Sequence, residues 1–148
     1  MTAADIRALG YRVYEAINTR NIAALEELFD PQVIRHAAGE TGIESVKNAV
    51  TNAFTTFPEK RFVVEDLLVE GDKAALRVTV HGVPTAPGQP QPIIMEIFRI
   101  ENGRVAEVWG AGTSLPFLGG EQIRISVDFG DKVCNKVMRK RTAASKPA

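Results

Sequence analysis

The spacing of apolar residues changes in the middle of this 148-residue chain, at Pro58. Before Pro58, apolar side chains recur every three or four residues, which is typical of amphipathic helices. After it, apolar and polar residues alternate, which is typical of strands with one buried face. Helices followed by consecutive strands predict an α+β domain with an antiparallel sheet, rather than a parallel doubly wound sheet.

Three helices are expected before Pro58, and Thr2 and Asp5 are start signals for the first. Their apolar stripes fall within residues 6–17, 22–29 and 43–54, and the third helix is expected to run from Gly42 to Phe57. Asp30-Pro31 is expected to end the second helix, because the residue before a proline avoids helical backbone angles. Residues 33–36, which follow, indicate a short strand at a sheet edge.

Four strands are expected after Pro58, with turn signals at Gly71-Asp72 and Asn102-Gly103. They cover residues 61–70, 73–83, 93–101 and 104–110. Alternation within 122–129 predicts a fifth strand, which adds to the sheet edge or crosses to a second subunit. We therefore expect one domain over residues 1–130, followed by a basic tail over 131–148.

Composition excludes several classes of function. The formal net charge is zero, which gives no electrostatic case for binding nucleic acid or an anionic membrane. No apolar run approaches the roughly 20 residues that span a bilayer. The single cysteine, Cys134, cannot form an internal disulfide, and no secretion signal precedes the first helix, so a cytoplasmic location is expected.

Three segments together resemble a known family. They read Phe29-Asp-Pro-x-Val-x-x-His36, then Phe57-Pro58 with Arg61-Phe-Val-Val-Glu-Asp-Leu-Leu-Val-Glu-Gly-Asp72, then Ile97-Phe-Arg-Ile-Glu-Asn-Gly-Arg-Val-Ala-Glu-Val-Trp109. In this order they resemble the SnoaL-like polyketide cyclases of the NTF2-like superfamily. The resemblance implies helices packed on a curved antiparallel sheet, in a cystatin-like α+β barrel with a cone-shaped pocket, often in a homodimer formed through the sheet.

The resemblance also directs attention to Glu96. Cyclases of this family use a carboxylate just after the hairpin tryptophan and a histidine on the preceding strand, whereas here Gly110 follows Trp109 and Glu96 takes the histidine position. Glu96 shares a strand face with Ile94 and Phe98, so desolvation is expected to raise its pKa and suit it to general acid/base catalysis. In the alternative, Glu96 faces solvent or pairs with Arg77 or Arg99 in the sheet.

Arg77 and His36 are the other catalytic candidates. Arg77 is suited to orient Glu96 or bind a substrate oxygen, and His36 can carry protons near neutral pH. Limonene-epoxide-hydrolase-like relatives carry Arg-x-Asp on this strand, where this chain has Arg77-Val-Thr79. Thr79 and His81 share the parity of Arg77, so all three either contact substrate or face solvent together.

Tyr14 and Trp109 complete the candidate substrate-binding residues, with Ile94 and Phe98. Tyr14 either reaches the pocket with its hydroxyl or packs in the core. Trp109 has the opposite parity to Gly110, so it points to a dimer contact if Gly110 lines the pocket. Two histidines 45 positions apart, with no cysteine cluster, predict no metal site, and no cofactor is expected.

We therefore expect a cofactor-independent enzyme of secondary metabolism, acting on a small hydrophobic molecule. Its reaction would be the acid/base cyclisation or isomerisation of an oxygenated, polyketide- or terpenoid-like metabolite. Two alternatives stay open. One is a non-catalytic ligand-binding or dimeric interaction protein, favoured by the missing carboxylate at Gly110. The other is an epoxide-hydrolase-like enzyme.

Overall fold

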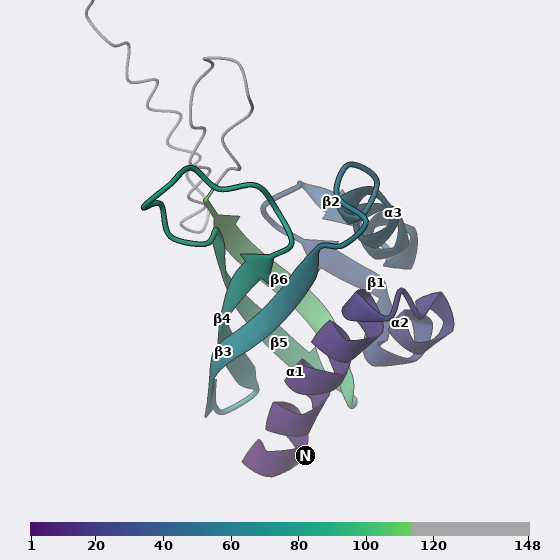
Figure 1. Ribbon diagram of the computed structural model, residues 1–148. Coiled ribbons are helices and arrows are strands. Elements are labelled where there is room, and N and C mark those ends of the chain that lie inside the picture. Colours follow the sequence, from purple (N-terminus) through teal and green to yellow (C-terminus); the bar gives the residue numbers. More distant parts are fainter. Residues whose placement is uncertain (114–148) are drawn as a thin grey trace, which may run out of the picture.

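The computed structural model describes residues 1–113, in which three helices and a six-stranded sheet form a layered α+β domain (Figure 1). The elements in chain order are α1 (Ala3–Asn18), α2 (Ile22–Leu28), β1 (Phe29–Arg35), β2 (Glu40–Thr41), α3 (Ile43–Ala53), β3 (Arg61–Glu70), β4 (Lys73–His81), β5 (Ile93–Glu101) and β6 (Arg104–Gly112). The α+β prediction is confirmed, because helices precede a run of three antiparallel hairpin-linked strand pairs.

The strand order in the sheet is β2-β1-β6-β5-β4-β3. All neighbouring pairs are antiparallel except β1 and β6, which run parallel. The sheet is therefore mixed rather than purely antiparallel, and it stays open, because β2 and β3 form its two edges and do not pair. The direction of β1 depends on how α2 delivers the chain to the sheet, and the apolar spacing of a short segment does not encode it.

Several sequence-based boundaries differ from the structure, since β4 ends at His81 rather than at residue 83 and β6 extends to Gly112 rather than ending at residue 110. The strand expected at 33–36 begins at Phe29 and contains Asp30 and Pro31, and it lies inside the sheet between β2 and β6. The third helix ends at Ala53 rather than continuing to Phe57. The strand predicted at 122–129, the end of the proposed domain at residue 130 and the basic tail at 131–148 all lie outside the described residues.

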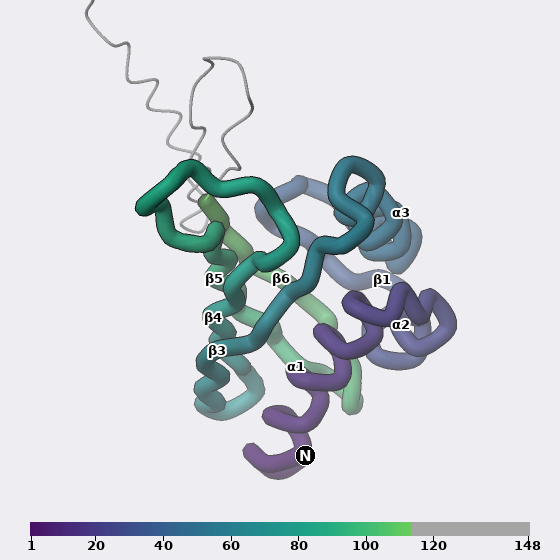
Figure 2. The backbone as a smooth tube through the Cα atoms, in the orientation of Figure 1, coloured from purple at the N-terminus to yellow at the C-terminus, as the bar shows by residue number. Residues whose placement is uncertain are grey.

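Helix α1 packs along β3, an edge strand of the sheet, as the backbone trace in Figure 2 shows. Thr2 caps its first turn together with Asp5, each accepting a hydrogen bond from the other's backbone. At its last turn, the amide of Asn18 bonds both the backbone N–H and the carbonyl of Phe62. A Cβ at Gly10 would come within 2.6 Å of Leu67, so this helix approaches the sheet closely.

The sheet has two different faces. On the inner face, beneath the helices, β4 presents Leu76 and Val78, which are fully buried, and these pair with Glu96 and Ile94 of β5. On the outer face, the alternate residues include Arg77, which pairs with Met95. Side chains of opposite parity in a strand point to opposite faces, so this register decides which candidates can meet. Within the described part, no helix is both long and apolar enough to cross a bilayer.

Candidate active site

A cavity of about 160 Å³ lies between α1, α3 and the inner face of the sheet. Most of its lining is aliphatic or aromatic, and it includes Ile94 and Phe98 of β5 together with Val46 and Val50 of α3. Three lining residues carry polar groups, and they are Tyr14, Arg35 and Glu96. An apolar hollow with a few convergent polar groups is the usual form of a small-molecule site.

Tyr14 and Glu96 form a direct pair in this cavity. The Tyr14 hydroxyl, on α1, donates a hydrogen bond of 2.6 Å to Oε2 of Glu96, on β5. The alternatives in which Glu96 pairs with Arg77 or Arg99 do not occur, since both arginines lie on the outer face and bond other carboxylates. Tyr14 therefore bonds only one of the two carboxylate oxygens, and Oε1 of Glu96 has no bond from Tyr14.

The surroundings of the pair favour proton chemistry at Glu96. Removal from water raises the pKa of Glu96, while the Tyr14 hydrogen bond and the charge of Arg35 act in the opposite direction. Burial, and then the charge of Glu96, raise the pKa of Tyr14 well above its usual value, so Tyr14 stays a neutral donor. Glu96 borders the cavity and is half-buried, which leaves it accessible to a ligand.

Gly110 provides the space that the Glu96 carboxyl group occupies. The two residues are paired across β5 and β6. A Cβ at position 110 would lie 3.2 Å from Cγ and 3.3 Å from Oε1 of Glu96, which is tighter than an ordinary contact. The glycine therefore has a structural role, because any side chain at position 110 would press on the Glu96 carboxylate of the neighbouring strand.

Arg35 is a cavity residue that the sequence analysis missed. It lies on β1 with the same parity as the fully buried Val33, and this parity is the signal that could have identified it. Its Nη1 donates to Oε2 of Glu40 at 2.6 Å and to the carbonyl of Ser45 at 3.0 Å. The guanidinium is thus anchored at the end of the cavity formed by the start of α3.

His36, one residue further along, lies on the outer face. Its Nε2 is 2.7 Å from Oε2 of Glu107, and its ring stacks on Trp109 with centroids 4.5 Å apart and planes at 4°. Glu107 also accepts a hydrogen bond of 2.6 Å from Nε of Arg99. The bond to His36 and then the contacts with Arg99 lower the pKa of Glu107, which stabilises its charged form.

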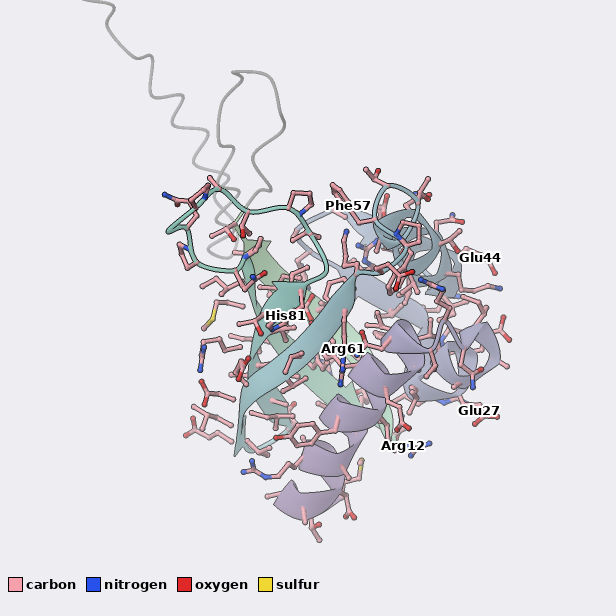
Figure 3. All side chains as sticks on the ribbon, viewed as in Figure 1. Arg12, Glu27, Glu44, Phe57, Arg61 and His81 are labelled. Atoms are coloured by element: carbon pink, nitrogen blue, oxygen red, sulfur yellow. The ribbon has the colours of Figure 1, made fainter. Side chains whose placement is uncertain are left out.

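Arg77, Thr79 and His81 also lie on the outer face. Nε of Arg77 bonds Asp66 at 2.6 Å, and the arginine side chain is 43 % exposed. The Thr79 hydroxyl donates to Glu65 and lies 3.0 Å from the ring of His81. Figure 3 shows His81 beside β3, well away from the helix α3. The thickness of the sheet separates these three residues from the cavity.

The structure therefore divides the predicted site residues into two groups. It brings together Glu96, Tyr14, Ile94 and Phe98 around the cavity. It gathers the remaining five candidates on the other face, and they are His36, Arg77, Thr79, His81 and Trp109. Within residues 1–113, no group of three histidine, cysteine, aspartate or glutamate side chains is arranged to hold a metal ion.

Helices packed on one face of an open, curved sheet around an apolar cavity define the class as an NTF2-like domain. The model of the SnoaL-like polyketide cyclase family matches residues 8–117 of the chain. The protein belongs to this family of SnoaL-like polyketide cyclases. No curated protein matches the chain by sequence.

Solved structures support the same fold. TsrD from Streptomyces laurentii is 26 % identical with a TM-score of 0.64, and the alignment covers 76 % of this chain and 90 % of TsrD. A SnoaL-like polyketide cyclase from Agrobacterium tumefaciens is 19 % identical with a TM-score of 0.60, covering 76 % and 91 %. A proposed ketosteroid isomerase from Kribbella flavida is 18 % identical with a TM-score of 0.62, covering 80 % and 85 %.

Proposed function

We propose that this protein is a cofactor-independent enzyme that moves protons on a small, hydrophobic, oxygenated molecule in the cavity. Glu96 is its general acid and base, and Tyr14 holds the carboxylate in position. Cyclisation or isomerisation of a polyketide- or terpenoid-like metabolite is the reaction class, in keeping with the family to which the chain belongs. Family membership alone does not fix an activity, because one fold carries many chemistries.

The proposed proton transfers need only the Glu96 carboxylate and the substrate, and no cofactor. The Glu96 carboxylate takes a proton from the carbon next to a substrate carbonyl, and the C–H electron pair becomes that of an enolate. In an isomerisation, the protonated Glu96 returns the proton to a different carbon of the same enolate. In a cyclisation, the enolate carbon attacks a second carbonyl carbon, a C–C bond forms, and the oxygen of that carbonyl takes the proton from Glu96.

The observation that most supports this proposal is the 2.6 Å hydrogen bond between Tyr14 and Glu96 on the wall of an apolar cavity. Burial raises the pKa of Glu96, and a base whose pKa approaches the working pH transfers protons in both directions efficiently. The bond occupies Oε2 and so leaves Oε1 for the substrate. An apolar lining excludes water, which strengthens electrostatic interactions inside the site.

The test follows the exchange of protons for deuterium in compact ketones such as 1-indanone and 2-tetralone, by NMR in D₂O. We expect the wild-type protein to accelerate exchange at the carbon next to the carbonyl. Glu96→Gln keeps the shape of the side chain but removes the base, so the acceleration should fall about 10²- to 10⁴-fold. Glu101→Gln, at the end of the same strand and outside the cavity, is the matched control and should exchange like wild type.

Two results would contradict the proposal. In the first, no ketone of the panel exchanges faster with wild-type protein than in buffer, which would favour a non-catalytic binding protein. In the second, Glu96→Gln exchanges as fast as wild type while remaining folded by circular dichroism, which would assign the proton transfer to another group.

We also propose that two copies associate through the outer face. Leu68, Ala75, Ile97 and Trp109 form one apolar row across four neighbouring strands. Leu68 is 69 % exposed and Ile97 is 43 % exposed, which is unusual for large apolar residues that share a row. Light scattering should give twice the chain mass for wild type and the single chain mass for Ile97→Arg, and a monomeric wild type would contradict this proposal.

A further inference from the structure

Arg35 brings a positive charge to the wall of an otherwise largely apolar cavity. Its side chain is 25 % exposed, so much of the guanidinium group is removed from solvent. Its anionic partner, Glu40, is 52 % exposed and is therefore shared with water. An anion that enters the cavity therefore interacts more strongly with this guanidinium than with one on the surface, because less water screens the pair.

The hydrogen bonds of Arg35 leave part of the guanidinium free. A guanidinium has five N–H donors, on Nε, Nη1 and Nη2. Both bonds that the structure gives to Arg35, to Glu40 and to the carbonyl of Ser45, come from Nη1. Among residues 1–113, no acceptor is bonded to Nε or Nη2. Two adjacent nitrogens with free donors match the two oxygens of a carboxylate or the two oxygens of a 1,3-dicarbonyl enolate.

The register of the sheet places Arg35 two strands away from Glu96. Arg35 is paired with Val108, which is paired in turn with Phe98, and Glu96 is paired with Gly110 in the next inward-facing row. Strands lie about 4.8 Å apart, so β1 and β5 are separated by about 10 Å across β6. Val108, on the strand between them, lines the cavity together with Arg35 and Glu96.

We propose that Arg35 forms an anion subsite and that the cavity takes a compact, apolar molecule carrying a carboxylate or an enolised 1,3-dicarbonyl group. The anionic oxygens bind Nε and Nη2 of Arg35, and the apolar body lies against the α3 side chains Val46, Ala49 and Val50. A cavity near 150 Å³ holds a single aromatic ring, which sets the scale of the buried part. This inference shares the cavity of the proposed function but requires no catalysis.

The charge of Glu96 provides an internal check on this subsite. Arg35 is close enough to Glu96 for its charge to oppose the effect of burial on that carboxylate. An anion bound at Arg35 must therefore meet repulsion from ionised Glu96. Removing the Glu96 charge should tighten anion binding, whereas it should leave the binding of a neutral molecule of the same shape unchanged.

The probe is benzoate, titrated into the full-length protein by isothermal titration calorimetry, with benzyl alcohol as the neutral counterpart. Wild type should bind benzoate more tightly than benzyl alcohol. Arg35→Met, which keeps the length of the side chain, should weaken benzoate binding about tenfold or more and leave benzyl alcohol within twofold. Arg77→Met, on the outer face, is the matched control and should behave like wild type. Glu96→Gln should bind benzoate several-fold more tightly.

Equal affinity of wild type for benzoate and benzyl alcohol would overturn the proposal, as would unchanged benzoate affinity in folded Arg35→Met. If Arg35→Met does not fold, Arg35→Gln replaces it with the same criterion, and Arg35→Lys should retain part of the benzoate affinity. These results are separable from the proposed catalysis. Benzoate binding that depends on Arg35, in a protein that exchanges no ketone protons, supports the subsite and contradicts the enzyme.

Discussion

Two carboxylates on neighbouring strands of this sheet have opposite surroundings. Glu96, on the inner face of β5, borders an apolar cavity and is bonded by the neutral hydroxyl of Tyr14. Glu107, on the outer face of β6, is bonded by His36 and by Arg99. Burial raises the pKa of Glu96, whereas its bonds lower the pKa of Glu107.

The comparison shows that the partners of a carboxylate decide its role. A carboxylate that accepts hydrogen bonds from a guanidinium and lies against an imidazole ring is stabilised in its charged form and is a weaker base. A carboxylate in an apolar cavity with one neutral donor keeps a proton more readily and can exchange it. Under the proposed function, the same residue type therefore contributes stability on one face of the sheet and reactivity on the other.

After the loss expected for Glu96→Gln, the largest effect that would sharpen this comparison is expected at Gly110. Gly110→Ala places a Cβ about 3.2 Å from Glu96, so the carboxyl group must shift by a few tenths of an ångström. We expect ketone exchange to fall roughly 10- to 50-fold, because catalytic geometry tolerates little displacement. Alanine costs less conformational entropy than glycine in a strand interior, so we expect the variant to remain folded, which circular dichroism checks. A variant with full exchange activity would show that Gly110 does not position Glu96.

A smaller loss of activity is expected for Tyr14→Phe. The change removes the donor to Oε2 of Glu96, and this hydrogen bond lowers the pKa of Glu96 in the wild-type protein. Exchange should fall about fivefold to tenfold, and the acidic limb of its pH profile, on which Glu96 becomes ionised, should move to higher pH. Tyr11→Phe is the matched control, since Tyr11 lies on the same helix but is 46 % exposed. Identical pH profiles for the two variants would contradict the pairing.

On the outer face, the expected change is in stability alone. Glu107→Gln removes the charge that pairs with Arg99 and weakens the contact with His36, and we expect the free energy of unfolding to fall by about 1 kcal/mol, as for a partly exposed ion pair. Ketone exchange should stay within twofold of wild type, because Glu107 does not line the cavity. Urea denaturation and the NMR assay measure the two quantities, and a large loss of exchange would break the distinction between the faces.

The smallest expected effect is on how the free energy of unfolding changes with pH, and its sign differs between Glu96 and Glu107. The pKa of Glu96 is higher in the folded protein than the value of about 4.3 for an unfolded chain. The stability that this difference contributes is present below that value and is lost as the pH rises. Wild type should therefore lose stability relative to Glu96→Gln from about pH 4 upward. A lowered pKa has the opposite sign, so the advantage of wild type over Glu107→Gln should shrink as the pH falls below about 4.3. Urea denaturation at several pH values measures both slopes, and equal signs would contradict the comparison.

The sequence predicted much of the fold because apolar spacing reports local structure directly. The alternation of β4 and β5 identified two sets of residues, and the hairpin signal at Asn102-Gly103 paired β5 with β6. The sequence also indicated Glu96 as a carboxylate among apolar neighbours. It did not decide which face of β4 lies beneath the helices, and this choice separates Arg77 from Glu96.

By itself, the sequence determined the order of the main helices and strands and the alternation along β4 and β5, since both depend on residues that are close together in the chain. Only the tertiary structure brought Tyr14 onto Glu96, 82 positions away, and placed Arg35 in the same cavity while its neighbour His36 faced outward. The physical reason is that these meetings depend on the parallel pairing of β1 with β6 and on the close packing of α1 against β3. Neither feature has a periodicity of its own that a local pattern could reveal.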